Sequence, residues 1–497
     1  MKALTIISAI FAFCLTAAVQ AQEYKAIVPD YVLTPDVIDT ESIGTLEFFD
    51  GMPSPETVSK VYDFIDLGRG VDAFLNGIPA TSIYAALRGC EEAGMRPNEI
   101  GIFEQLMDAK SLWLTPNSTT VYVVSHVDLS NGPIVAEIPP GVLGLLDDAF
   151  FRYVTDFGAA GPDKGEGGKY LILPPGYEGE VPEGYFVAQS KTYHNWYLVR
   201  AFVRNGDLKA AADGVKAGTR LYRLSQANNP PVQVFHNLSG VQYNTIHANT
   251  FEFYEELNEV IQREPADAFD PELVGIFAAI GIKKGEPFEP DARMRRILTE
   301  AAAIGNATAR AITYSPRSDR VYFWEDRQWN SPFAGGSHEF MNDGERVLDD
   351  RVYFHYLATG ITPAMVNSAV GQGSAYAHVA KDSNGEYLDG GKNYKIDLPG
   401  PVPAKDFWSF MVYSGQHRSM LETDQRRAGL DSLSESLVAN DDGSYSVWFG
   451  PSPPEAGEGN WVQTVPGKSF SSLFRLYGPL EPWFDKTWRP GDFELIE

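Results

Sequence analysis

The chain contains very little cysteine, with two such residues in 497. Cys14 lies in an N-terminal stretch typical of a cleaved leader, and Cys90 lies in a segment with helical spacing, ALRGCEEAG. With one cysteine left after cleavage, no internal disulfide can form, so hydrophobic cores must hold the fold. We expect Cys90 to be a buried structural thiol, because no histidine lies near it in the sequence.

Long hydrophobic runs are absent after the N-terminal stretch. A membrane-spanning helix would need roughly 18 consecutive apolar residues, and no later segment has them. The first residues, MKALTIISAIFAFCLTAAVQAQ, have the form of a secretory leader. Lys2 supplies the charged start, an apolar run follows, and Val19-Gln20-Ala21 is a small-residue cleavage site. We therefore expect cleavage after Ala21 and a soluble mature protein that is periplasmic or secreted.

Positive charge is scarce, with 40 Lys and Arg against 66 Asp and Glu and a formal net charge of −26. Such a surface repels nucleic acid and anionic lipid, which argues against nucleic-acid binding. We expect the partner to be a small molecule or a glycan, and the sequence favours no particular oligomeric state.

The usual hydrolase motifs are also absent. The sequence contains no Gly-x-Ser-x-Gly elbow and no His-Glu-x-x-His zinc helix, and its eight histidines are scattered singly. Any catalytic cluster must therefore be assembled by the fold. Carboxylates are abundant, so hydrolysis by paired acids stays open.

The patterns that are present predict a mixed, mainly β protein: two β-sandwich or jelly-roll modules with a helical N-terminal segment and a helical middle region. The segment 54–57 predicts a helix start, and Asn76-Gly77-Ile78-Pro79 predicts a break before a second helix. We expect this order: signal peptide 1–21, helical segment 22–99, antiparallel β-sandwich module 100–205, helical region 206–312, aromatic-rich connection 313–349 and jelly-roll-like module 350–497.

A glycine-rich stretch, DFGAAGPDKGEGGKYLILPPGY (156–177), is the most unusual local feature. It fails as a phosphate loop, because Asp163 stands where the first glycine is needed and Tyr170 where Ser or Thr is needed. No cofactor is evident, but Asp156, Asp163 and Glu166 could supply oxygen ligands, for which calcium is the fitting metal. An ordered connection between two strands is the favoured interpretation.

Large aromatic residues are frequent in the predicted strands. Most should belong to hydrophobic cores. Those beside turns, such as Trp329 and Trp483, could instead line a groove for a sugar or another flat or apolar ligand.

Several long strings are specific enough to compare with known families. They are LNGIPA (75–80), LTPNSTTVY (114–122), VDLSNGPIVAEIPP (127–140), YLILPPGYEG (170–179), the Arg200 strand, GSAYAHVAKDSNGEYLDGGKNY, FWSFMVY, NDDGSYSVWFGP, NWVQTVPGK and FRLYGPLEPWFDKTW. They resemble an exported bacterial family that pairs domain of unknown function 1254 with domain of unknown function 1214. The resemblance implies a β-sandwich module, a helical middle portion and a jelly-roll-like C-terminal module, and it supplies no reaction.

One motif departs from that family's pattern. Members often carry Tyr-Asp-x-x-Thr-Arg after the FWS strand, whereas this chain has YSGQHR (413–418), with Ser414 in place of the acid. Any ligand-binding role of that acid is in doubt in this chain.

Two arginines, Arg200 and Arg475, stand in otherwise apolar strands. A buried arginine must be paired, because an uncompensated buried charge costs several kcal/mol. Strand alternation places Leu473, Arg475 and Tyr477 on one face, which we expect to point toward a polar cavity. A structural ion pair is the alternative.

These features favour an exported, hydrolase-type enzyme with its site between the two β modules. The predicted site residues are Asp156, Asp163, Arg200, Arg475 and Tyr477. An acid would act as the base, and an arginine would hold an anionic group or an oxyanion. The alternative is a non-catalytic module that binds a small molecule or a glycan in an aromatic-lined groove.

Overall fold

The computed structural model describes residues 28–455 and 457–496. It divides into two units, Met1–Phe64 and Ile65–Glu497, and the boundary falls inside helix α1 (Pro55–Glu92). The predicted signal peptide, 1–21, lies outside the described residues. None of the helices in the described part of the chain is long and apolar enough to cross a membrane.

The first unit contains a small sheet and the start of α1. Ser54 caps this helix, because its hydroxyl accepts a hydrogen bond of 3.2 Å from the backbone N–H of Thr57. The helix start predicted at 54–57 is therefore confirmed. The other elements are a 3-10 helix, η1 (Asp30–Val32), and three antiparallel strands, β1 (Val37–Thr40), β2 (Gly44–Phe49) and β3 (Met52–Pro53).

Helix α1 runs through Pro79, so the break predicted at 76–79 is wrong. Phe74 and Ile78 are fully buried in one cluster with residues of α3 (Glu252–Arg263), and the Phe74 ring stacks on Phe253 at 4.0 Å. A proline inside a helix costs roughly 3 kcal/mol. Burial of two large apolar side chains, each contributing roughly 1.5–3 kcal/mol, offsets that cost.

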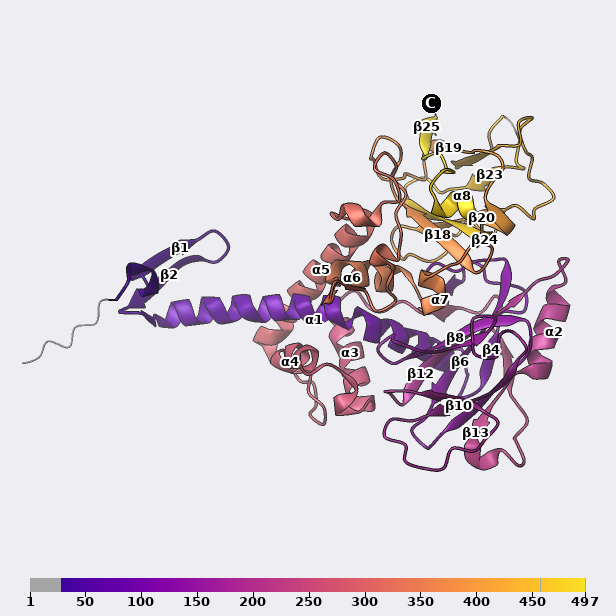
Figure 1. The fold of residues 1–497 in the computed structure, drawn as a ribbon. Coiled ribbons are helices and arrows are strands. Elements are labelled where there is room, and N and C mark those ends of the chain that lie inside the picture. Colours follow the sequence, from indigo (N-terminus) through magenta and orange to yellow (C-terminus); the bar gives the residue numbers. More distant parts are fainter. Residues whose placement is uncertain (1–27, 456, 497) are drawn as a thin grey trace, which may run out of the picture. The chain divides into compact units, whose positions relative to one another are not determined.

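The middle region contains helices, but it also contributes two strands to the sheets of the first module. Residues 220–223 and 235–237, which were predicted to lie in a helical region, form β13 and β14. Helix α5 packs against α6, as Figure 1 shows. The helices of the middle region are α2 (Leu208–Gly218), α3, α4 (Pro271–Ala279) and α5 (Ala292–Tyr314), and α6 (Leu348–Leu357) follows later in the chain.

The first β module consists of two sheets that share a hydrophobic core. Not every pair is antiparallel as predicted, because β10–β11 and β4–β14 run parallel. The six-stranded sheet has the order β14 (Phe235–Asn237), β4 (Ile100–Ile102), β6 (Thr120–Asp128), β12 (His194–Phe202), β8 (Val142–Asp148), β9 (Tyr153–Gly158). The four-stranded sheet has the order β11 (Phe186–Gln189), β10 (Gly168–Leu173), β7 (Ile134–Ile138), β13 (Arg220–Arg223). Two short pairs are β5 (Ser111–Leu112) with β15 (Tyr243–Asn244) and β16 (Met341–Asn342) with β17 (Glu345–Arg346).

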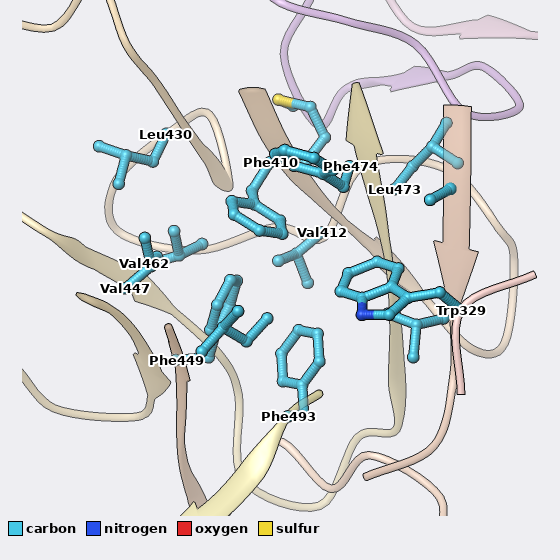
Figure 2. Packing of buried hydrophobic residues seen from close by; sticks show 14 of the residues in the cluster. Trp329, Phe410, Val412, Leu430, Val447, Phe449, Val462, Leu473, Phe474 and Phe493 are labelled. Atoms are coloured by element: carbon cyan, nitrogen blue, oxygen red, sulfur yellow. The ribbon is translucent and has the colours of Figure 1, made fainter. Parts of the chain in front are cut away.

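The second β module also contains two four-stranded sheets around one core. Figure 2 shows that core, in which Phe410 and Phe474 of one sheet meet Phe449 of the other. One sheet has the order β18 (Ser374–Val379), β24 (Phe470–Pro479), β20 (Ala404–Ser414), β21 (Gly429–Asp431). The other has the order β23 (Trp461–Gln463), β22 (Tyr445–Gly450), β19 (Asn393–Leu398), β25 (Glu494–Ile496), and α8 (Glu481–Phe484) follows β24.

The two tryptophans proposed for a ligand groove lie in this core instead. Trp329 is fully buried, and its indole N–H donates to the carbonyl of Gly491 at 2.9 Å. Trp483 packs edge-on against Trp324 at 5.8 Å. The coarse fold class is thus confirmed as a mixture of helices and several sheets, but the aromatic groove at Trp329 and Trp483 is wrong.

A Trp329→Ala substitution should lower the free energy of unfolding by about 3–5 kcal/mol. It leaves a large cavity, and it removes the indole N–H that donates to the Gly491 carbonyl. Chemical denaturation followed by fluorescence would measure this loss. Tyr387→Ala, at a side chain that is 54% exposed, is the control and should change stability little. Unchanged stability of the Trp329 variant would contradict its core position.

Candidate functional site

A cavity of about 710 Å³ lies between the two β modules, within the second unit. One wall is a face of the six-stranded sheet, and the other is the face of β18, β24 and β20 opposite the core of Figure 2. Phe474 and Leu476 point into that core, so Arg475 and Tyr477 point the other way. Both line the cavity, as the strand alternation predicted.

On the first wall, the strand register groups side chains into rows that cross the strands. Arg200 of β12 stands between Tyr122 of β6 and Leu143 of β8. The next row on the same face consists of Leu198 of β12, Leu145 of β8 and Asp156 of β9, so Asp156 lies beside apolar side chains.

On the second wall, the register places Arg475 beside Tyr376 of β18. Tyr477 lies between Ser374 of β18 and Phe407 of β20. The rings of Tyr477 and Phe407 stack with centroids 3.9 Å apart, which holds the phenol in a fixed orientation.

Arg475 is 3% exposed and is held by neutral acceptors. Its Nη2 donates to the carbonyl of Thr115 (2.8 Å) and to the hydroxyl of Tyr413 (2.8 Å). Its Nη1 has no hydrogen-bond partner among the described residues. No carboxylate within the described part of the chain forms an ion pair with Arg475, so the structural ion pair considered for it is wrong.

Arg200 likewise has no ion-pair partner among the residues that the structure describes, and phenol groups surround it. Burial alone would lower the pKa of Arg200, but the oxygens of Tyr376, Tyr122 and Tyr477 raise it. Burial also acts to lower the pKa of Arg475, but Tyr413, Tyr477 and Tyr122 raise it. Both guanidinium groups therefore stay charged, and they share the same pair of hydroxyl neighbours.

Two hydroxyl groups add donors at this end of the cavity. The Tyr477 hydroxyl is buried and has no partner among the described residues, and burial raises its pKa, so it stays protonated. The Tyr122 oxygen accepts a hydrogen bond of 3.0 Å from Asn117 Nδ2, which leaves its own hydrogen for another acceptor. This end thus combines positive charge with several donors.

Asp156 marks a second polar point of the cavity. Its Oδ2 accepts a hydrogen bond of 2.7 Å from the Thr362 hydroxyl, beside the short helix α7 (Pro363–Val366). Its Oδ1 is buried and has no partner among the described residues. Burial raises the pKa of Asp156 to about 6, and hydrogen bonds from the Thr362 and Tyr153 hydroxyls oppose that rise. A carboxyl in this state can accept a hydrogen bond or take up a proton near neutral pH.

Asp163 does not line the cavity, and its carboxylate instead organises the glycine-rich connection between β9 and β10. Its Oδ1 accepts from the backbone N–H of Gly158 (2.8 Å) and from the Tyr170 hydroxyl, and its Oδ2 accepts from Gly167 N–H (3.0 Å). No helix begins at Lys169, so the stretch is an ordered strand connection, as predicted. Asp163 therefore lies apart from the cavity that the other four predicted site residues line, because its oxygens are turned into its own loop.

The rest of the lining is mainly apolar. It comes from the sheet face, from the end of α6 and from the segment around α7. Representative residues are Trp113, Leu114, Leu357, Phe333, Phe354 and Met365.

The sequence did not single out Tyr122, Tyr376 or Thr362. Tyr122 and Tyr376 do lie in strings that carry the family resemblance, LTPNSTTVY and GSAYAHVAKD. Each of these tyrosines lies opposite an arginine on the neighbouring strand, Tyr122 opposite Arg200 and Tyr376 opposite Arg475, and so lines the cavity. Spacing along the sequence does not reveal which residues of two strands lie opposite each other.

Other reactive groups are poorly placed for chemistry. Burial raises the pKa of the Cys90 thiol to about 12, and its sulfur lies 3.2 Å from the Tyr243 hydroxyl, so the predicted structural thiol is confirmed. His378 lines the cavity, but burial lowers its pKa to about 3. Across residues 28–455 and 457–496, no group of three or more His, Cys, Asp or Glu side chains is arranged to hold a metal ion.

Two family models match the chain. Residues 97–223 match the protein of unknown function DUF1254, and residues 373–481 match the protein of unknown function DUF1214. The chain thus carries both domains in the predicted order. The first matched region supplies Asp156 and Arg200, and the second supplies Arg475 and Tyr477, so both contribute polar groups to the cavity.

Two solved structures match the chain, and the first, with a TM-score above 0.5, shows a similar fold. The VPA0106 protein from Vibrio parahaemolyticus is 18% identical, with a TM-score of 0.54 over 87% of this chain and 100% of its own. An uncharacterized protein from Burkholderia cenocepacia is 13% identical, with a TM-score of 0.39 over 88% of this chain and 96% of its own. No curated protein matches the chain.

Asp163→Ala should lower the free energy of unfolding by about 2–4 kcal/mol, because two backbone N–H groups and the Tyr170 hydroxyl lose their acceptor. Asp163→Asn keeps one carbonyl oxygen and should cost less. Chemical denaturation would measure both. Equal stability of the alanine variant and the unmodified protein would refute the role assigned to this carboxylate.

Asp156→Asn should stabilise the ligand-free protein at alkaline pH and have little effect in acid. The pKa of Asp156 is about 6 in the folded protein and roughly 3.9 in an unfolded chain. The folded state therefore loses stability as pH rises through that range, while the neutral amide does not titrate. Melting temperatures across pH would test this, with Asp319→Asn at an exposed position as the control. A pH-independent difference would contradict the prediction.

Proposed function

We propose that this protein binds a small organic acid in the cavity between its two β modules. One observation carries the proposal. Arg200 and Arg475 line the same cavity from opposite walls, and neither has a carboxylate partner among the described residues.

The energetic argument concerns buried charge. A guanidinium removed from water without a counter-charge costs several kcal/mol, and Arg475 is in that position, while the partly exposed Arg200 lies on the opposite wall of the same cavity. An anionic ligand would supply the missing charge. A carboxylate suits the site because it accepts two parallel hydrogen bonds from an arginine and further bonds from hydroxyls such as those of Tyr122 and Tyr477.

The apolar lining supports a ligand with a hydrocarbon body. A cavity of about 710 Å³ lies within the range typical of sites for drug-sized molecules. Leu145 and Leu198 of the first wall and Phe354 and Met365 opposite would contact that body. A glycan is less suited, because Trp329 and Trp483 lie in the core and offer no exposed ring platform.

A hydrolytic enzyme is the second candidate, and Asp156 favours it. Asp156 lines the cavity, and its pKa near 6 suits a general base. Such an enzyme would place an ester or amide between Asp156 and the arginines, and the arginines would hold the acid that is released. Export through the predicted leader would place either function in the periplasm or outside the cell.

Calorimetry with octanoate, octanol and octylamine tests the binding function. Octanoate should bind at least about tenfold more tightly than the other two, since it alone supplies a negative charge. Arg200→Met should remove that preference. Arg69→Met changes an exposed arginine in the same way and should leave the preference intact.

Arg475 needs a gentler variant, because its Nη2 also hydrogen-bonds the backbone of Thr115. Arg475→Lys keeps the charge, loses the planar fork and should weaken octanoate binding with the fold retained. Equal binding of all three compounds would rule out the organic-acid site. Mass spectrometry of octanoate esters incubated with the protein would reveal hydrolysis, which Asp156→Asn should abolish.

A further inference from the structure

We propose that residues 28–65, which comprise the described part of the first unit and the next residue of α1, form the interface through which two copies of this protein associate as a dimer. This surface is independent of the cavity and of the ligand proposed for it. Residues 28–65 expose many large apolar side chains, and they bury almost none.

The first unit has almost no hydrophobic core of its own. Among the apolar side chains of its described residues, 28–64, Leu46 alone is buried. A small sheet needs a covered hydrophobic face to be stable. Ordering the backbone costs roughly 1–2 kcal/mol per residue, whereas burying one leucine contributes only about 1.5–3 kcal/mol. The fold of this unit therefore needs apolar contacts beyond its own.

Exposed apolar residues gather in this segment. Of the 25 large apolar residues that the described chain exposes, ten lie within residues 28–65. Four of the ten are aromatic, and their exposed fractions are 90% at Tyr31, 84% at Phe49, 61% at Tyr62 and 49% at Phe64. At about 150–250 Å² for each whole side chain, these four leave roughly 400–700 Å² in water. With the six aliphatic residues, the segment approaches the roughly 800 Å² that each partner contributes to a stable interface.

The exposed apolar residues of the small sheet share one face. Val37 pairs with Glu47, and Phe49 lies two residues further along the same strand, so Val37 and Phe49 lie on the face opposite to Leu46. Met52 pairs with Phe49, and its side chain therefore lies on that face too. This face offers an apolar surface to a partner.

The first turns of α1 carry a matching apolar stripe. Its residues recur at intervals of three and four, and they are Val58, Val61, Tyr62 and Ile65. This spacing is that of the seam between two paired helices. Glu56 and Lys60 lie on the opposite side of the helix, where they form an ion pair of 2.7 Å. A second helix can thus cover the stripe without burying this pair.

A second copy of the chain is the partner that fits this surface. The described part of the first unit has eight acids and one base, Lys60, so it repels anionic lipid and nucleic acid. A second copy brings an equal stripe with the same spacing, and a two-fold axis lets each copy cover the other. Because the two acidic surfaces repel each other, salt should tighten the dimer by screening them. A basic partner would show the reverse dependence on salt.

Sedimentation velocity of the protein, expressed without the predicted leader, tests the association over about 0.1–50 μM. The unmodified protein should be a dimer at the upper end of this range. Phe49→Asp and Tyr62→Asp, each tested alone, should raise the dimer Kd at least about thirtyfold, because each buries a charge in the interface. Tyr387→Asp changes an exposed tyrosine outside the segment and should leave the Kd unchanged.

Hydrogen exchange measured by mass spectrometry tests the same interface through the backbone. Amides of β2 and of the first turns of α1 should exchange at least about tenfold faster in Phe49→Asp than in the unmodified protein, because the unit loses its cover. Amides of β24, in the second β module, are the internal control and should exchange at the same rate in both proteins.

Four results would overturn the dimer interface. The first is a monomer at every concentration. The second is a dimer that Phe49→Asp and Tyr62→Asp leave as tight as the Tyr387→Asp control does, because its interface would lie elsewhere. The third is a dimer that salt weakens. The fourth is a monomer that sediments with phosphatidylcholine vesicles, which would assign the apolar surface to a lipid instead.

Discussion

The cavity depends on one set of hydrogen bonds, which ties the second β module to the first. Arg475, on β24, donates to the carbonyl of Thr115 in the loop before β6. The Tyr413 hydroxyl reaches the neighbouring carbonyl of Pro116 at 2.6 Å. Thr115 has a positive φ of 44°, which a β-branched residue adopts only when its surroundings hold it there. Its hydroxyl also donates to the carbonyl of Leu357 at 2.7 Å. The loop is thus fixed from β24, β20 and α6, and the same arginine that fixes it lines the cavity.

The charge at the proposed acid end of the cavity differs from that of the whole chain. The formal net charge is −26, whereas this end carries the buried Arg475 and the partly exposed Arg200, with the exposed Asp406 also in the lining. Surface charges act over roughly 8–10 Å at physiological salt, so an anion entering the cavity leaves most of that repulsion behind. Inside, low polarity strengthens each contact with a guanidinium. A protein without a ligand then carries the cost of these unpaired charges as lost stability, which is a common property of binding sites.

The sequence predicted those features that depend on neighbouring residues in one strand or turn. Alternation along β24 placed Arg475 and Tyr477 on one face, and the glycine-rich stretch was correctly interpreted as a strand connection. Local sequence pattern gave wrong predictions where contacts with distant segments determine the secondary structure. Pro79 stays helical because α3 packs on α1, and β13 joins a sheet because β7 lies beside it. Asp156 and Asp163 lie in the same glycine-rich stretch, and the sequence does not distinguish their roles. In the structure, Asp156 pairs with Leu145 of the neighbouring strand, whereas Asp163 accepts hydrogen bonds from its own loop.

Burial without a carboxylate partner is not enough to identify a binding site, as Arg418 shows. This residue is fully buried, and none of its guanidinium nitrogens has a hydrogen-bond partner among the described residues. Its guanidinium lies 3.6 Å from the centre of the Tyr356 ring, so a cation–π contact replaces part of the lost hydration. Ser414, where related chains often have an acid, accepts from the backbone N–H of Gln416 at 3.2 Å and so completes a turn. Arg418 does not line the cavity, whereas Arg200 and Arg475 do. The cavity beside Arg200 and Arg475 therefore distinguishes a place for an anion from a packed structural cation such as Arg418.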